Sequence, residues 1–167
     1  MQARELLLTQ FKQAHSFLES TISDVTDEAV SLKIEGATIS PIGPIYAHVV
    51  LAEDAIVNEI IRGTKTVLES KGWNEKLDVQ KAPLFQQEGW EKTRIDLPAF
   101  REYAAEVHAA TIQFLESATD EELTKEVGQR NVPAIQFLGL VGLLHVAEHW
   151  GEIAALKGAT GSKGLPF

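Results

Sequence analysis

Apolar side chains recur three or four positions apart in four long segments of the chain, a spacing that places them on one face of an α-helix. Leu7, Phe11 and Leu18 form such a stripe near the N-terminus, and Phe100 begins another in the third segment. The second and fourth segments are apolar on nearly every face, so we expect them to be the most buried. The pattern predicts long helices over residues 2–21, 44–62, 97–118 and 132–157.

Shorter elements are expected between these helices. Thr26 and Thr119 each precede acidic residues, a pattern typical of a residue that caps the first turn of a helix. Another turn of helix is expected within residues 66–71. The connection over residues 64–96 is the least regular part of the chain, and its role stays open. Trp73 and Trp90 could cap the mouth of a pocket, but we expect them instead to pin this connection to the core. No run of residues predicts a β-strand.

These elements predict an all-α fold, a four-helix bundle with short connecting helices. The length of 167 residues suits a single domain over residues 1–167. The tetrapeptide FLES occurs at residues 17–20 and again at 114–117, near the ends of the first and third helices. If this echo is a real repeat, the bundle consists of two similar halves.

Composition narrows the function classes. A net charge of −9 without a basic stripe disfavours binding to nucleic acid or to an anionic membrane. The longest apolar run, residues 132–147, is interrupted by Gln136 and His145 and is shorter than the roughly 18 to 20 residues of a membrane span. The N-terminal residues begin a polar-faced helix and do not have the pattern of a signal peptide. We therefore expect a soluble, cytoplasmic protein.

The chain contains no cysteine, which excludes disulfides, cysteine nucleophiles and cysteine-ligated zinc. A metal ion would have to be held by histidine, carboxylate, carbonyl or water. Any thiol chemistry would need a small-molecule thiol as a partner.

Two histidines four residues apart are the main polar feature of the fourth helix. His145 and His149 lie on one helix face with Glu152 close by, so both imidazoles can reach one point. Histidine is the commonest metal ligand in proteins, although such a pair also suits two hydrogen-bonded core histidines. His48 lies among small side chains on the second helix, so it can face this pair across the core.

Three imidazoles at one point predict a site for Zn²⁺, Ni²⁺ or a similar divalent cation. Three protein ligands leave a coordination position open to water or substrate, which is typical of a catalytic site. Glu148 and Glu152 are the candidate catalytic groups. These two residues, with Glu53 and Asp54, are also candidates to orient the imidazoles.

Two further observations concern the other histidines and a competing motif. His15 and His108 flank the apolar stripes of the first and third helices, so we expect ordinary boundary residues there. The order His145-x-x-Glu148-His149 matches the inverted zinc-peptidase motif, with Glu148 as general base. That class takes a glutamate well downstream as its third ligand, and no glutamate follows Glu152. The peptidase hypothesis is therefore the weaker one.

Taken together, these motifs resemble the DinB/YfiT-like superfamily of metal-dependent enzymes. The matching stretches are AHVVLAE at residues 47–53, HxxxHxGE from residue 145, and GLPF at 164–167. The resemblance implies a four-helix bundle, often dimeric, with a divalent metal bound by His48, His145 and His149. It also implies a range of activities, from S-transferases or isomerases that use mycothiol or bacillithiol to metal-dependent hydrolases.

The site and the resemblance lead us to expect a metal-dependent enzyme, with thiol-dependent transferase chemistry ahead of hydrolase chemistry. The expected partners are a divalent metal (zinc or nickel), a low-molecular-weight thiol, a small-molecule substrate and a second copy in a homodimer, with no nucleic acid and no membrane. The alternative is a non-catalytic, stress-related binding module whose histidines hold a structural or vestigial metal.

Overall fold

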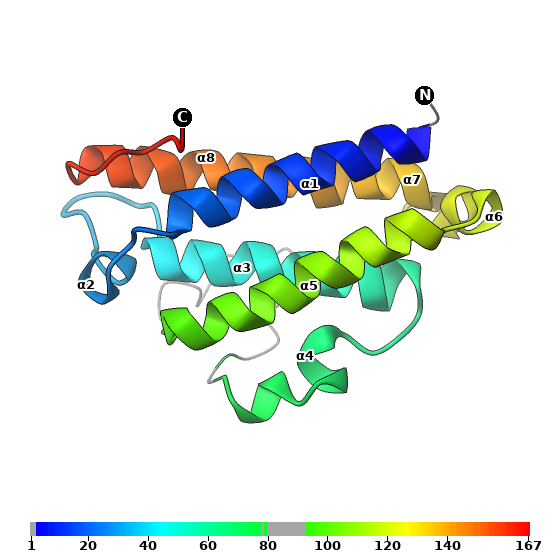
Figure 1. Cartoon of the computed structure of the whole chain (residues 1–167), viewed down its shortest axis with the longest axis horizontal. Coiled ribbons are helices and arrows are strands. Elements are labelled where there is room, and N and C mark those ends of the chain that lie inside the picture. The colour runs from blue at the N-terminus through cyan, green and yellow to red at the C-terminus, as the bar shows by residue number, and fades with distance from the viewer. Residues whose placement is uncertain (1–2, 78, 80–92) are drawn as a thin grey trace.

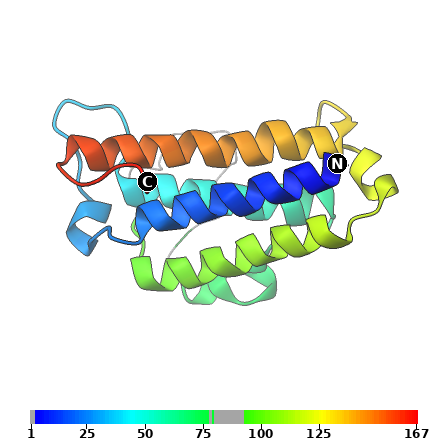
Figure 2. The same ribbon diagram turned by 45° about the horizontal axis from the view of Figure 1, so that its top comes forward.

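The computed structural model describes residues 3–77, 79 and 93–167 and confirms the expected helical fold. Four long helical segments run alongside one another (Figures 1 and 2). The first and third segments are single α-helices, whereas the second and fourth each contain a π-helical stretch. The segments are α1 (Ala3–Ile22), α3 (Ile42–Asp54) with η1 (Ala55–Ile61), α5 (Leu97–Ser117), and α7 (Ala134–Phe137) with η4 (Leu138–Leu143) and α8 (Leu144–Ala159).

Both α1 and α3 pack against α5 and against α8, which closes the four segments into a bundle. α3, which the structure describes in full, is buried along its whole length except at His48. Within α8, also described in full, the buried residues are Val146, Ile153, Ala154, Leu156 and Lys157. The second helix is therefore as buried as expected. The expectation for the fourth helix was wrong, because only one stripe of α8 faces α1 and α3.

Two helix starts differ from the expected ones. α3 begins at Ile42, because Pro41 occupies the N-cap position and Pro44 falls in the first turn, where its missing N–H is not needed. The fourth segment begins at Ala134, because β2 (Val132–Pro133) pairs with β1 (Glu126–Val127) in an antiparallel ladder. Two-residue strands are too short for an alternating pattern, so the sequence did not predict them.

The expected caps of the short helices are confirmed. Thr26 Oγ1 accepts a hydrogen bond from the Ala29 amide at 3.2 Å, at the start of α2 (Asp27–Val30). Thr119 opens α6 (Asp120–Thr124) with a capping box that includes Glu122. In the described part of the chain, the other short helices outside the four long segments are α4 (Val67–Ser70) and η2 (Trp73–Glu75).

Part of the connection over residues 64–96 packs on the bundle. Trp73 is 5% exposed and belongs to the main hydrophobic core, which confirms that it pins this connection. The matching expectation for Trp90 lies outside the described residues. Among the described residues, no helix combines the length and apolarity that crossing a membrane would require.

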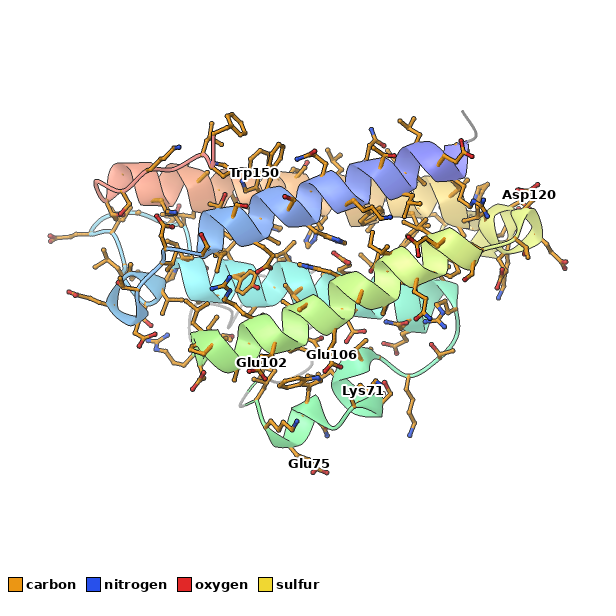
Figure 3. All side chains as sticks on the ribbon, in the orientation of Figure 1. Lys71, Glu75, Glu102, Glu106, Asp120 and Trp150 are labelled. Carbon is orange, nitrogen blue, oxygen red and sulfur yellow. The ribbon has the colours of Figure 1, made fainter. Side chains whose placement is uncertain are left out.

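After α8 the chain turns back along the helix, and its last residues contact the same bundle (Figure 1). The ring of Phe167 lies 5.4 Å from that of Phe17 on α1. Trp150 of α8, which Figure 3 labels, donates from Nε1 to Thr21 Oγ1 of α1 at 2.8 Å. A Cβ at Gly164 would lie 2.4 Å from the Ala154 carbonyl oxygen, so this close approach needs glycine.

Candidate metal centre

Three imidazoles converge between α3 and α8. The Nε2 atom of His145 lies 2.9 Å from that of His48 and 3.1 Å from that of His149. One ring nitrogen from each histidine lies within 4.8 Å of the others, and all three side chains are half-buried. The i,i+4 spacing on α8 therefore presents two imidazoles to a third that comes from α3.

The three rings are arranged edge-on around the place where their Nε2 atoms come close. Each pair of rings is edge-on, with interplanar angles of 69°, 89° and 84°. Glu152 accepts a hydrogen bond from Nδ1 of His149 at 2.6 Å. With its proton on Nδ1, His149 has a lone pair on Nε2, the atom that faces the other two rings.

The surroundings keep two of the imidazoles neutral. Burial, together with the nearby His149, lowers the pKa of His48 to about 4. Burial, with added repulsion from His149 and His48, lowers the pKa of His145 to about 3. Near neutral pH both rings are unprotonated, which is the form that binds a metal ion.

A comparison with protein-family models shows the family of this chain. The family model for the DinB superfamily matches residues 10–153, which is most of the chain. The chain belongs to the DinB superfamily. A solved structure, described as the crystal structure of the conserved protein of locus from Enterococcus faecalis, matches this DinB protein with a TM-score of 0.76 and 16% sequence identity. The match covers 94% of this chain and 96% of that chain, and it supports the fold alone. No curated protein matches the sequence.

The donor set of this DinB protein suits a divalent cation. Zn–N bonds of about 2.0–2.1 Å place the nitrogens of a tetrahedral site roughly 3.3 Å apart, close to the separations of 2.9 and 3.1 Å. In a neutral imidazole, Nε2 has either one N–H or one lone pair. The Nε2 atom of His145 therefore cannot form a separate, well-directed hydrogen bond with each of its two neighbours. A cation accepts lone pairs from all three. Membership of the DinB superfamily and the cluster of three histidines are together compatible with a metal-binding protein.

The four predicted carboxylates have different positions. Glu152 contacts His149, as described above, and its side chain is 45% exposed. Glu148 is exposed on α8, and among the described residues it makes no hydrogen bond to the three imidazoles. Glu53 and Asp54 do not orient the imidazoles by direct contact, contrary to that expectation. Both are buried and bind elsewhere in the bundle.

Asp54 connects three elements of the DinB fold. Its carboxylate accepts hydrogen bonds from the amides of Val67 and Leu68 at 2.8 and 2.9 Å, at the start of α4. It also accepts one from the Tyr103 hydroxyl of α5 at 2.7 Å. The side-chain amide of Asn58 also donates to it, at 2.8 Å. Because four donors depend on it, Asp54 has a structural role at this position.

The expectation for His15 and His108 was wrong. Both are buried, at 6% and 7% exposure, and their rings stack with centroids 3.9 Å apart. His15 Nε2 lies 3.0 Å from Glu53 Oε2. The available signal was Glu53 itself, because a carboxylate on an otherwise apolar helix needs a buried partner. The sequence could not identify that partner, since His15 and His108 come from two other helices.

Proposed function

We propose that this DinB protein is a metal-dependent enzyme that acts on a small molecule at an open site formed by His48, His145 and His149. The observation that carries the proposal is the convergence of three Nε2 atoms with edge-on rings. When bound, a divalent cation supplies a Lewis acid with a coordination position left for a small molecule. Zn²⁺ and Ni²⁺ suit an all-imidazole donor set, and we propose one of these two.

The roles of the protein residues follow from their contacts. The three histidines would bind the cation through Nε2. Glu152 would hold His149 in the tautomer that has its lone pair on Nε2. Half-burial of the site limits competition from water while leaving a route for a small molecule.

The proposed chemistry is transfer of a group to a low-molecular-weight thiol, with hydrolysis as the second choice. The thiol must come from a small molecule, because the chain has no cysteine of its own. We also propose that the protein is cytoplasmic. We propose further that it forms a homodimer, and sedimentation analysis of the purified protein tests this oligomeric state.

Elemental analysis of untagged protein tests the metal centre. We expect His48→Ala to lower the bound Zn²⁺ or Ni²⁺ by about one ion per chain, because two ligands on one helix hold an ion poorly. Glu148→Gln is the matched control, since Glu148 lies on α8 between two proposed ligands and is exposed. A metal-free wild type, or unchanged metal content in His48→Ala, would refute the proposal.

Activity assays separate the remaining alternatives. A panel of thiol-transfer and hydrolysis reactions should show turnover that depends on the metal. If the metal is present and its removal lowers the melting temperature, but no reaction turns over, the protein is the non-catalytic binding module. Peptidase activity that Glu148→Gln abolishes without loss of metal would support the inverted zinc-peptidase motif instead.

A further inference from the structure

A second cluster of metal-binding side chains lies in the bundle, away from the three-histidine site. It consists of His15 of α1, Glu53 of α3 and His108 of α5, each less than 8% exposed. One ligand-type atom from each residue lies within 4.8 Å of the other two. Glu53 follows His48 by five residues, about 140° around the helix, so α3 presents the two clusters on different sides.

The hydrogen bonds of this cluster leave one nitrogen unsatisfied. Glu53 accepts from the Thr111 hydroxyl at 2.6 Å through Oε1 and contacts His15 Nε2 at 3.0 Å through Oε2. His108 Nε2 is buried, and no residue that the structure describes gives it a hydrogen-bond partner. A buried polar atom without a partner is uncommon in proteins, and a bound ion is one of its recognised explanations.

We propose that His15, Glu53 and His108 form a second divalent-metal site with two imidazole donors and one carboxylate donor. This donor set suits Zn²⁺ and other first-row transition metals. The rings of His15 and His108 lie nearly parallel, at 9°, so their in-plane lone pairs run side by side. Binding therefore requires one ring to turn, so that both nitrogens point at the ion. The site is closed to solvent, so the ion joins α1, α3 and α5 and has a structural role.

Glu19 is a further carboxylate that lies close to this cluster. Its side chain is 28% exposed, and its Oε1 lies 3.9 Å from Nδ1 of His108. Glu19 also accepts a hydrogen bond from the Tyr46 hydroxyl at 2.7 Å. It provides a carboxylate between the solvent and the buried donors.

The experiment counts Zn²⁺ in full-length protein that is stripped with a chelator, reloaded with Zn²⁺ alone and freed of excess ion. Removal of the three-histidine site by His145→Ala with His149→Ala isolates the second site. We expect this double variant to keep about one ion per chain, and we expect Glu53→Gln or His108→Phe in the same background to remove it. His108→Phe keeps the stacked ring while it removes the nitrogens.

Asp54→Asn in the same background is the matched control. Asp54 is as buried as Glu53 and lies next to it on α3, but it bonds to Tyr103 and to the amides of α4. Asp54→Asn should therefore keep the ion. Circular dichroism of each variant establishes that it is folded, and two different ligand substitutions keep the test decisive if one of them does not fold.

The outcomes separate this proposal from that of the three-histidine site. A folded double variant that binds no Zn²⁺ overturns the second site and leaves the first one intact. An ion that survives both Glu53→Gln and His108→Phe also overturns it. If the double variant loses no ion relative to wild type while Glu53→Gln does, the second site stands and the three-histidine proposal fails.

Discussion

At the scale of single residues, Glu152 is a partly exposed carboxylate that contacts one imidazole of the three-histidine site. Its carboxylate holds the Nδ1 proton of His149, and this contact determines which ring nitrogen has the lone pair. Glu148, on the same helix, has no such contact among the described residues. These two glutamates of the same helix therefore differ in their contacts, because only Glu152 reaches an imidazole.

We expect Glu152→Gln to weaken metal binding by about 10- to 100-fold, because an amide orients the imidazole less strongly than a carboxylate. Competition titration against a chromophoric chelator measures the affinity. Glu148→Gln should bind the metal as wild type does. Equal affinities in both variants would show that the Glu152–His149 contact does not tune the site.

The lowered pKa of His108 predicts that the protein becomes less stable in acid. Its folded pKa of about 4 lies below the value of about 6.5 for an unperturbed histidine. The unfolded chain therefore binds the proton first, so stability falls as the pH decreases from about 6.5 to about 4 and is fully present above that window. Protonated His108 would face His15, Glu53 and Glu19.

The experiment is urea denaturation between pH 4 and 7 in the presence of a chelator. Between pH 7 and pH 4, the free energy of unfolding of the wild type should fall by up to about 3 kcal/mol more than that of His108→Phe. A parallel dependence in the two proteins would show that His108 does not take up a proton on unfolding.

At the scale of helices, a few buried polar contacts determine how the elements are connected. Asp54, at the end of α3, binds both the first amides of α4 and Tyr103 of α5. In the same way, Lys157 of α8 donates from Nζ to the Thr21 carbonyl oxygen of α1 at 2.7 Å and pairs with Asp24. Each contact satisfies backbone groups at a helix end that would otherwise be buried without partners.

Asp54→Ala should destabilise the fold by about 3 kcal/mol, because two backbone amides, the side-chain amide of Asn58 and the Tyr103 hydroxyl lose this acceptor. Tyr103→Phe is the comparison, since it removes one donor and should cost about 1 kcal/mol. Chemical denaturation measures both values. A cost for Asp54→Ala no larger than that for Tyr103→Phe would show that α4 does not depend on this carboxylate.

At the scale of the whole molecule, α3 is the central element of the bundle. It packs against α5 and α8, contributes His48 to one cluster and Glu53 to the other, and is buried except at His48. α8 lies further out, so the three-histidine site is half-buried while the second cluster is closed. This difference in depth is the physical basis for proposing a catalytic role for the first site and a structural role for the second.

The sequence by itself determined the features that depend on neighbours along the chain. The apolar stripes of α1 and α5, the caps at Thr26 and Thr119, and the pairing of His145 with His149 on one face are local, because helical periodicity places residues three or four apart together. His48 could be matched to that pair because it lies among small side chains on an apolar helix, and the family resemblance implied the same three residues.

Only the tertiary structure decided the features that depend on which helix faces meet. The burial of His15 and His108 against Glu53, the partners of Asp54 and the partial exposure of α8 arise between segments tens of residues apart. No local pattern encodes such contacts, because a side chain at the edge of an apolar stripe becomes buried or exposed according to the helix that packs on it.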